Sequence, residues 1–376
     1  MKIILTGGGS GGHFYPIISV AQAINEYCKQ EKLLAPELYY LAPTQYDANA
    51  LFENNITWRR TTAGKMRRYF SLLNFFDIFK TLWGCIKAVQ LVYKIYPDVV
   101  FGKGGYVSFP VLFAARILNI PVVIHESDSA PGRVNAWAGK FAERIAIGYP
   151  ESIQYFPKDR TAYTGNPVRR ELRVAVREGA HDILELSPAL KTILVLGGSQ
   201  GAAAINDAVL DALPILLEKY QVIHQVGKAN IKLVKETAAV ILQKSEHKNR
   251  YKPYDFLNIL NMRMAAGVAD LIVSRGGAGS ISEIAIWGKP SIIIPIPQPT
   301  SHDQTKNAFN YARTGAAVVI EQANLTPHLL VSEVERIFSN QELQNSMAAA
   351  AAAFARTDAA ELIAKEIVAI AVSHEA

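Results

Sequence analysis

Near its amino terminus the chain reads Ile3-Ile4-Leu5-Thr6-Gly7-Gly8-Gly9-Ser10-Gly11-Gly12-His13, and this stretch decides the fold. A short apolar run followed by glycines and a helical pattern predicts a buried strand, a tight turn and a helix. The second half repeats the arrangement, with Ile193-Leu194-Val195-Leu196 running into Gly197-Gly198-Ser199-Gln200-Gly201-Ala202. Such a turn directs unpaired backbone N–H groups and the positive end of a helix dipole toward an anion such as phosphate. The sequence therefore predicts two similar α/β halves.

Apolar runs alternate with helical periods along the whole chain, as expected for βαβ units and a parallel sheet. In the first half we expect strands at residues 2–5, 38–41, 98–101, 121–125 and 144–147. In the second half we expect them at residues 192–196, 222–226, 271–274, 291–295 and 317–320. Helices are expected at residues 16–28, 74–93, 109–118 and 134–142, with two alanine-rich helices at 341–356 and 359–373. Residues 164–169 are expected to link the halves.

Length and composition narrow the class of protein. A chain of 376 residues, half of them hydrophobic, suits two domains with a large core. No uninterrupted apolar stretch reaches the roughly 18–20 residues of a membrane span. We expect no signal peptide, because only a short apolar run separates Lys2 from the glycine turn. The two cysteines, Cys28 and Cys85, are expected to be buried free thiols, which fits a reducing cytoplasm, and no zinc-type cluster occurs.

The positive charge of the chain is concentrated in one window. Between Trp58 and Lys103, nine basic residues are opposed only by Asp77 and Asp98. This window carries +7, so the rest of the chain carries −1 of the total of +6. We therefore expect one basic surface that faces an anionic partner. Its members are Arg59, Arg60, Lys65, Arg67, Arg68, Lys80, Lys87, Lys94 and Lys103.

The helix expected at residues 74–93 has a broad apolar and aromatic stripe. Phe75, Phe79, Leu82 and Ile86 recur at helical spacing, and Phe76 and Trp83 widen the stripe. A stripe of this kind usually packs in a core, but here basic residues surround it, which favours docking on an anionic bilayer. Nucleic acid is the alternative for a basic surface, but no nucleic-acid-binding motif accompanies it. The predicted membrane-docking residues are Phe75, Phe76, Phe79, Lys80, Leu82 and Trp83.

His13 stands at the carboxyl edge of the first strand, where open α/β sheets bind ligands. Its ordinary pKa near 6.5 suits a general base; the alternative is a structural residue that only forms hydrogen bonds. The glycines before it do not follow strict dinucleotide-binding spacing, and close strand–helix packing is their alternative role. The loops at residues 101–108 and 124–132 end neighbouring strands, so Tyr106 and Glu126 are expected near His13.

A second glycine-rich site, Ser274-Arg275-Gly276-Gly277-Ala278-Gly279-Ser280-Ile281-Ser282-Glu283, follows another strand and begins a helix. Its small residues would expose N–H groups to a diphosphate, and Glu283 could accept hydrogen bonds from ribose hydroxyls. Arg275 is expected to face phosphate. The alternative, which can hold at the same time, is a capping box of Ser280 and Glu283. Downstream, Asp303 and Gln304 could contact sugar hydroxyls, with helix capping by Asp303 as the alternative.

Together these stretches resemble the bacterial cell-wall glycosyltransferases that make lipid II, the undecaprenyldiphospho-muramoylpentapeptide β-N-acetylglucosaminyltransferases. The resemblance is carried by residues 7–13, 101–108, 125–132, 165–169, 197–202, 274–283 and 303–308. It implies an α/β fold of the GT-B type, with two Rossmann-like parallel-sheet domains facing across a cleft and a C-terminal helix returning to the first domain. The expected domains are residues 1–165 with 346–376, for the acceptor and the membrane, and residues 166–345, for the UDP-sugar.

The same resemblance implies transfer of N-acetylglucosamine from UDP-N-acetylglucosamine to the C4 hydroxyl of lipid I with inversion, on the cytoplasmic face of the membrane. Other cell-wall synthesis proteins are implied partners, and nucleic acid is not. The acceptor side would be formed by His13, Tyr106 and Glu126, which are the expected catalytic residues. Donor contacts would come from Ser10, Gly11, Gly12, Arg169, Ser199, Asp303, Gln304, the backbone of Ile259, and the run Ala278, Gly279, Ser280, Ile281, Ser282 and Glu283, beside Arg275, which is expected from its place in the turn to face phosphate.

One position departs from the family pattern. The family has a His-Glu-Gln-Asn run, whereas this chain reads His125-Glu126-Ser127-Asp128. An ionised Asp128 cannot donate a hydrogen bond as an asparagine amide does, so the substrate contact at 128 must differ.

No Asp-x-Asp pair occurs in the chain. We therefore expect no essential metal and no cofactor, with a helix terminus and Arg169 stabilising the departing UDP. Three rival functions are a UDP-N-acetylglucosamine 2-epimerase, which needs no membrane-docking face, a glycolipid synthase that accepts diacylglycerol, and a non-enzymatic regulator that binds the donor without turnover.

Overall fold

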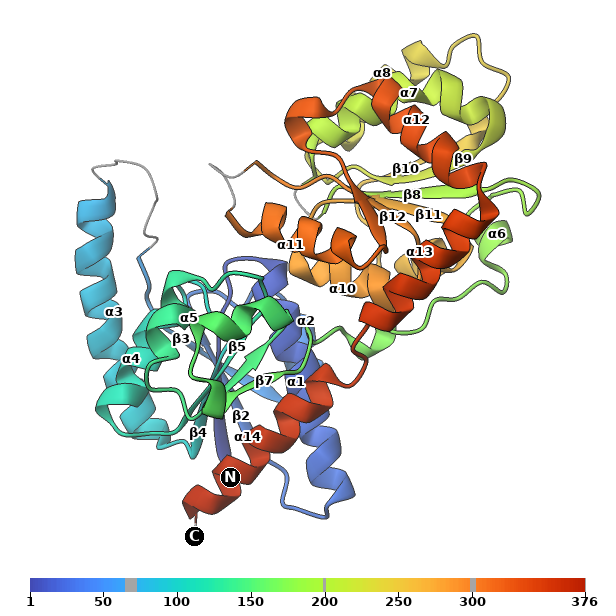
Figure 1. The fold of residues 1–376 in the computed structure, drawn as a ribbon. Helices are drawn as coiled ribbons and strands as arrows, with labels where there is room; N and C mark the ends of the chain where they lie inside the picture. Colours follow the sequence, from blue (N-terminus) through green and yellow to red (C-terminus); the bar gives the residue numbers. More distant parts are fainter. Residues whose placement is uncertain (65–72, 199–200, 298–301, 376) are drawn as a thin grey trace. The chain divides into compact units, whose positions relative to one another are not determined.

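The chain forms two compact units in a computed structural model that describes residues 1–64, 73–198, 201–297 and 302–375. Unit 1 comprises Met1–Arg169 and Arg356–Ala376, and unit 2 comprises Arg170–Ala355 (Figure 1). The boundary expected after residue 165 lies in the same connecting segment as the one found. The boundary expected at residue 346 falls inside helix α13 (Gln341–Phe354).

Unit 1 is built on a seven-stranded sheet in the order β3-β2-β1-β4-β5-β6-β7, with every pair parallel. The central strands β1, β4 and β5 are mostly apolar and are buried except at Lys2, as expected for parallel strands that are covered on both faces. The sequence did not predict β3, which is mostly exposed, or β7, which is three residues long and lies at the edge. The strands are β1 (Lys2–Thr6), β2 (Glu37–Ala42), β3 (Ile56–Arg60), β4 (Val99–Gly102), β5 (Val122–Glu126), β6 (Arg144–Ile147) and β7 (Thr161–Tyr163).

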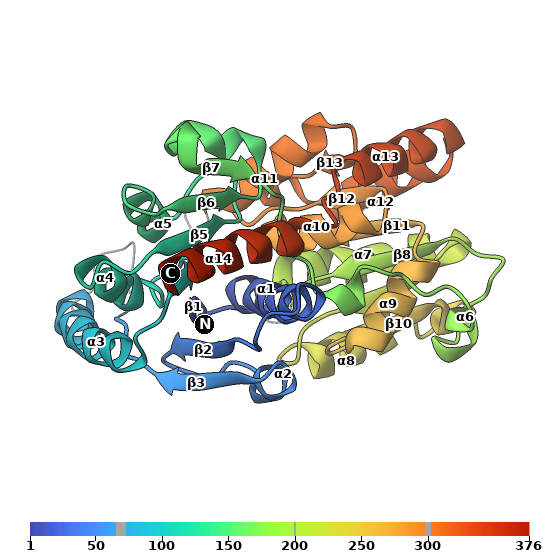
Figure 2. The same ribbon diagram turned by 90° about the horizontal axis from the view of Figure 1, so that it is seen from below.

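Helices cover both faces of this sheet. On one face, Ile3 and Leu5 pack with residues of α1 (Gly11–Gln30) and α14 (Ala359–Glu375). On the other face, Ile4 packs with residues of α3 (Leu73–Ile95) and α4 (Phe109–Ile117). Figure 2 shows α14 lying beside α1, on the opposite side of the sheet from α3 and α4. Two shorter helices, α2 (Ala48–Glu53) and α5 (Arg133–Ala138), complete the unit with the 3-10 turns η1 (Pro150–Tyr155) and η2 (Lys158–Arg160).

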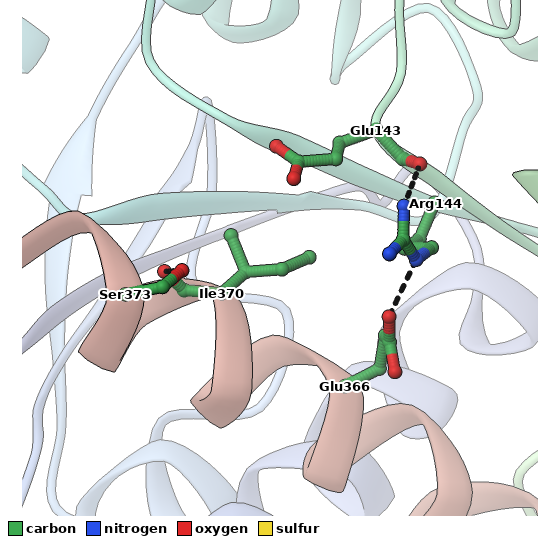
Figure 3. A network of polar contacts seen from close by, with 5 residues as sticks. All are labelled: Glu143, Arg144, Glu366, Ile370 and Ser373. Carbon is green, nitrogen blue, oxygen red and sulfur yellow. Dashed lines mark hydrogen bonds and ion pairs between the residues drawn. The ribbon is translucent and has the colours of Figure 1, made fainter.

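The last helix, α14, is tied to the sheet by both apolar and polar contacts. Ile363 and Ile367 lie in the core, while Glu366 accepts a hydrogen bond from the guanidinium of Arg144 at 2.5 Å. Arg144 also donates to the carbonyl of Glu143, and Figure 3 shows this chain of contacts next to Ile370 and Ser373. The segment that follows unit 2 therefore returns to complete the core of unit 1.

Unit 2 has a six-stranded parallel sheet in the order β10-β9-β8-β11-β12-β13. The strand not predicted from sequence, β10, contains Pro253, and proline is confined to edge strands because it cannot donate to a ladder. The strands are β8 (Thr192–Leu196), β9 (Gln221–Gln225), β10 (Tyr251–Tyr254), β11 (Leu271–Ser274), β12 (Ser291–Ile293) and β13 (Ala317–Val319).

Helices also cover both faces of the second sheet, with separate cores that contain Val195 on one side and Leu194 on the other. The helices besides α13 are α6 (Ala180–Ile183), α7 (Ala203–Lys219), α8 (Ile231–Ile241), α9 (Ile259–Val268), α10 (Ala278–Ile286), α11 (His302–Arg313) and α12 (Pro327–Phe338). Short 3-10 turns are η3 (Arg170–Leu172), η4 (Lys248–Arg250) and η5 (Gln322–Asn324).

Each sheet reverses its strand order at one place, between β1 and β4 in unit 1 and between β8 and β11 in unit 2. Open parallel sheets bind ligands outside the carboxyl ends of the strands at such a switch point. A ligand site is therefore expected in the loops after these four strands, with the loop after β5 next to the one after β4. Among the residues that the structure describes, no helix is both long and apolar enough to span a bilayer.

Candidate active-site loops of the two units

The turn after β1 has a backbone that requires glycine. Gly7, Gly8 and Gly9 have φ values of 151°, 144° and 88°. A side-chain carbon on Gly7 would lie 2.8 Å from Cβ of Lys103, and one on Gly8 would lie 2.8 Å from the hydroxyl of Tyr40. The Tyr40 hydroxyl donates to the carbonyl of Gly7 at 2.6 Å. The glycines thus let the turn fit closely between two neighbouring strands.

His13 lies in the first turn of α1, and its ring is held from one side. Nδ1 lies 2.9 Å from Oγ of Ser10, the residue that precedes the helix. Nε2 points toward the loop after β4, because a side-chain carbon on Gly105 would lie 3.5 Å from it. When Nδ1 carries the proton and donates to Ser10, the lone pair of Nε2 remains available as a base.

Burial, and secondarily the charge of Lys103, lower the pKa of His13 to about 4. The expectation of an ordinary pKa near 6.5 is therefore wrong. Both causes disfavour the charged imidazolium, which loses hydration inside the protein and is repelled by the nearby ammonium group. At neutral pH the ring is uncharged, the state that a general base requires.

Tyr106 lies against the same glycine turn. A side-chain carbon on Gly9 would come 3.3 Å from Cε1 of Tyr106 and 3.7 Å from its hydroxyl oxygen. The loop after β4 therefore brings this phenol to the turn that leads into His13, as the strand order predicts.

Glu126, at the end of β5, is buried, and its carboxylate accepts hydrogen bonds from three protein donors. They are the backbone N–H of Asp128 at 3.0 Å, the N–H of Gly132 at 3.1 Å, and the side-chain amide of Asn135 at 2.9 Å. Burial, followed by the charge of Asp128, raises the pKa of Glu126, whereas the hydrogen bond from the N–H of Asp128, the charge of Lys103 and the hydrogen bond from Asn135 oppose the rise. In this structure Glu126 holds the shape of its own loop.

Lys103 is the residue that sequence reasoning misplaced. It is only 2% exposed, so the prediction that it belongs to the basic surface is wrong. Its position between two strand-end glycines, Gly102 and Gly104, was the available signal, since such loops turn inward at the switch point. Of the other basic residues, Arg59, Arg60, Lys80 and Lys94 are exposed and Lys87 is half-buried, while Lys65, Arg67 and Arg68 lie outside the described residues.

The apolar stripe of α3 is exposed where its side chains are described. Phe79, Leu82, Trp83 and Ile86 are 57%, 56%, 64% and 54% exposed, with Lys80 exposed among them. The side chains of Phe75 and Phe76 lie outside the described residues. Most helices of globular proteins bury their apolar stripe, whereas the described part of this stripe is exposed to solvent.

In unit 2, the loop after β11 leads into α10 without a side-chain cap. The residue before the helix is Gly277, and Ala278, Gly279 and Ser280 are the first three helical residues. The predicted capping box of Ser280 and Glu283 is therefore wrong, because Ser280 already lies inside the helix. A side chain added to Gly279 would meet nothing within 4 Å, so the helix N-terminus has space in front of it. Next to it, Ser282 donates to the carbonyl of Ala278 at 2.9 Å, and Ile281 is buried.

Two polar side chains, those of Arg275 and Gln304, lie near the start of α10. Arg275 donates to the carbonyl of Ile294 at 3.2 Å, and burial lowers its pKa. Gln304 accepts from the N–H of Ile296 at 3.1 Å, and its Nε2 would lie 4.0 Å from a side-chain carbon on Gly277. Helix α11 begins at His302, so Asp303 does not precede the helix and its predicted capping role is wrong. The side chain of Asp303 and all of Ser199 lie outside the described residues.

The remaining expected contacts lie at helix starts or beside them. Ser10, Gly11 and Gly12 form the start of α1, and Ile259 is the first residue of α9 and 41% exposed. The guanidinium of Arg169 stacks on the ring of Tyr15 at 4.1 Å, and its Nε is buried with no hydrogen-bond partner in the described part of the chain.

The described residues contain no group of three or more His, Cys, Asp or Glu side chains that could hold a metal ion. Cys28 and Cys85 are both buried free thiols, as predicted.

Models of known protein families match both units. The N-terminal domain of glycosyltransferase family 28 matches residues 3–147, and the C-terminal domain of that family matches residues 192–363. The chain belongs to glycosyltransferase family 28. This confirms the resemblance inferred from the motifs, and the two parallel-sheet units confirm the predicted fold class.

Two relatives are similar to this chain over nearly its full length. A protein of Clostridium novyi (strain NT) is 33% identical over 344 residues, which cover 91% of this chain and 91% of that protein. A protein of Treponema denticola is 34% identical over 386 residues, covering 96% of each. Both are named UDP-N-acetylglucosamine–N-acetylmuramyl-(pentapeptide) pyrophosphoryl-undecaprenol N-acetylglucosamine transferase.

Solved structures agree with the family 28 fold. The crystal structure of MurG from Acinetobacter baumannii is 26% identical, covers 98% of this chain and 99% of that one, and has a TM-score of 0.73. The UDP-GlcNAc 2-epimerase of Neisseria meningitidis has a TM-score of 0.67 at 14% identity, covering 98% and 100% of the two chains. At that identity the second likeness concerns the fold alone.

Proposed function

We propose that this family 28 chain is an inverting glycosyltransferase that moves N-acetylglucosamine from UDP-N-acetylglucosamine to the C4 hydroxyl of lipid I and forms lipid II. The relatives named for this reaction, which cover more than nine-tenths of the chain, support the choice of substrates. The observation that carries the chemistry is His13, whose Nδ1 is held by Ser10 while Nε2 points into the loops at the switch point of unit 1.

His13 is the general base of this proposal. Its neutral ring takes the proton of the C4 hydroxyl through Nε2 as that oxygen attacks the anomeric carbon from the face opposite UDP, which inverts the configuration. In the tautomer whose Nδ1–H donates to Oγ of Ser10, this hydrogen bond orients the ring and leaves the lone pair of Nε2 free to act as the base. Tyr106 lies beside the same turn as a further acceptor contact, and Glu126 shapes the loop that carries Asp128.

Unit 2 holds the donor in this proposal. The uncapped N–H groups at the start of α10 and the positive end of its dipole bind the diphosphate and stabilise the charge that develops on departing UDP. The backbone at Ile259 contacts uracil, Glu283 accepts from the ribose hydroxyls, and Gln304 with Asp303 contacts the sugar. Arg275 of this unit supplies positive charge, as does Arg169, the last residue of the first segment of unit 1, and Ser199 is a further expected contact of the diphosphate. No metal ion is required by this arrangement.

The lipid-linked acceptor also needs a route to the protein. We place that route on α3, whose exposed apolar side chains and Lys80 fit an anionic bilayer surface. The protein would then act from the cytoplasmic face of the membrane as a peripheral protein, within reach of other cell-wall synthesis proteins.

The deciding experiment is incubation of the protein with labelled UDP-N-acetylglucosamine and a lipid I analogue, with and without EDTA. We expect a lipid-linked disaccharide under both conditions. Conversion of the donor to its C2 epimer without any lipid-linked product would replace the transferase by an epimerase. Loss of transfer only in EDTA would overturn the metal-free part of the proposal.

A further inference from the structure

Tyr15 lies near the start of α1, two residues after His13, and one face of its ring carries the guanidinium of Arg169. The central carbon of that guanidinium lies 4.1 Å from the centre of the ring. A cation at this distance is attracted by the negative face of an aromatic ring. Nε of Arg169 is buried and has no hydrogen-bond partner among the described residues. Stacking on Tyr15, and not a hydrogen bond through Nε, therefore orients the guanidinium.

The ring of Tyr15 also lies against the first residue of α1. A side-chain carbon on Gly11 would come 3.4 Å from Cδ2 and 3.5 Å from Cε2 of Tyr15. One ring thus contacts Arg169 and the helix start to which Gly11 and Gly12, two of the expected donor contacts, belong. Tyr15 thereby brings a fixed positive charge to the positive end of a helix dipole, where anions bind.

The loop after β2 holds the ring of Tyr15 in place. Tyr46 meets it edge-on, with ring centres 5.9 Å apart and planes at 90°, and the Tyr15 hydroxyl donates to the carboxylate of Asp47 at 3.4 Å. Tyr46 has a left-handed φ of 59°, which a bulky residue keeps only where its surroundings enforce it. This loop therefore limits the positions that the ring of Tyr15 can take.

The segment that leads to Arg169 is anchored on the same unit four residues earlier. The N–H groups of Thr164 and Gly165 both donate to the carbonyl of Ile147 at 3.1 Å. Nε2 of His125 donates to the carbonyl of Gly165 at 2.9 Å. The segment therefore leaves the sheet of unit 1 at a fixed place, and the stack on Tyr15 fixes the side chain at its end.

An arginine side chain has many rotamers, so fixing it in advance lowers the ordering cost when an anion binds. We propose that Tyr15 is a positioning residue whose ring holds the guanidinium of Arg169 beside the start of α1 for the diphosphate of the donor. This inference rests on the proposed function, in which Arg169 supplies positive charge to that diphosphate. Tyr15 touches no substrate in this arrangement. Its loss should therefore weaken donor binding only while Arg169 is present.

A double-mutant cycle on donor affinity tests this role. The variants are Tyr15→Leu, which removes the ring, Arg169→Met, and the two together, each titrated with UDP-N-acetylglucosamine in a calorimeter. We expect Tyr15→Leu to raise the Kd of the donor about threefold to tenfold, which is within the range of a cation–π contact. In the Arg169→Met background the same change should alter the Kd by less than about twofold. An equal rise with and without Arg169 would overturn the inference.

Two further variants separate the stack from a loss of stability. Tyr15→Phe keeps the ring face and should bind the donor within about twofold of the parent. Phe141→Leu is the matched control, because Phe141 also lies under an arginine of unit 1, with the guanidinium of Arg116 5.4 Å from its ring centre. It should lower the unfolding temperature and leave the donor Kd unchanged. If Tyr15→Leu yields no folded protein, Tyr15→Met takes its place with the same expected Kd.

The outcomes distinguish this inference from the proposed function. Weaker binding by Arg169→Met but not by Tyr15→Leu overturns the positioning role alone. Unchanged binding by Arg169→Met overturns both the positioning role and the contact of Arg169 with the donor. A parent that binds UDP-N-acetylglucosamine but transfers nothing to a lipid I analogue overturns the proposed function, and the binding cycle still decides the role of Tyr15.

Discussion

The loop after β1 in unit 1 and the loop after β11 in unit 2 share a backbone plan but differ in their side chains. Both leave a buried strand, pass through glycines and begin a helix at a strand end. Around the first lie the imidazole of His13, the side chain of Lys103 and the phenol of Tyr106. The start of α10, by contrast, consists of Gly277, Ala278, Gly279 and Ser280, none of which titrates near neutral pH.

The difference shows how one local geometry serves two kinds of chemistry. A bare helix N-terminus attracts negative charge through its N–H groups and dipole. The same terminus with Ser10 and His13 on it holds an imidazole in one orientation, because the hydroxyl that would cap the helix is bonded to the ring instead. The first loop is therefore suited to moving a proton, and the second to holding an anion.

Replacing His13 by alanine should remove the proton transfer proposed for the first loop and leave donor binding at the second loop unchanged. We expect kcat to fall by about 10²–10⁴, the usual contribution of a general base. Titration calorimetry should show unchanged affinity for UDP-N-acetylglucosamine. His328→Ala, an exposed histidine of α12, is the control and should keep full activity. If the kcat of the His13→Ala variant stays within a few-fold of that of the parent, His13 is not the general base.

Replacing Gly277 by aspartate should impair donor binding at the second loop and leave the first loop unchanged. The new carboxylate can cap α10, so we expect the unfolding free energy to rise by a few tenths of a kcal/mol. It would also occupy the place of the donor diphosphate and repel it, which should weaken donor binding by about tenfold or more. Gly277→Ala is a fair control, because the φ of −68° suits any residue and a side-chain carbon there meets no atom closer than 3.9 Å. Unchanged donor affinity in the aspartate variant would show that the start of α10 does not bind the diphosphate.

The pH dependence of transfer should report the lowered pKa of His13. Because its pKa is lowered to about 4, the base is unprotonated well below neutral pH, and kcat/KM should decline only as pH approaches 4. The unfolded chain takes up that proton near pH 6.5, so the stability that neutral His13 provides is present above pH 6.5 and is lost as pH falls toward 4. The difference in unfolding free energy between the parent and His13→Ala isolates this effect. An acid limb of kcat/KM near pH 6.5 would show that His13 is not shielded in solution.

The smallest expected effect compares the exposed apolar helix faces of the two units. Trp83 of α3 is 64% exposed and Leu233 of α8 is 67% exposed. If α3 docks on membranes, Trp83→Ala should weaken sedimentation with anionic phospholipid vesicles several-fold, and Leu233→Ala should leave it unchanged. Transfer to a water-soluble acceptor analogue should be unaffected in both. Equal losses in the two variants would mean that α3 has no special part in docking.

The sequence by itself determined where the central strands lie along the chain. It also determined the family, through its motifs. Apolar runs such as residues 192–196 and 271–274 coincide with β8 and β11, because burial on both faces leaves a continuous apolar signal. The glycine turns were readable for a similar reason, since the positive φ values after β1 require glycine whatever the surroundings. These are local properties, and each is contained in a few neighbouring residues.

Only the tertiary structure decided which side chains are buried and which charges meet. Edge strands β3, β7 and β10 are short, polar or interrupted by proline, so their pairing depends on the neighbouring strand and not on their own pattern. Lys103 looked like part of a basic surface until Thr6, Gly7 and Ser127, distant in sequence, were seen to enclose it. The lowered pKa of His13 follows from its own desolvation and from the charge of Lys103, which lies far from it in the sequence. Desolvation and charge proximity are sums over residues far apart in the chain, and no local pattern contains them.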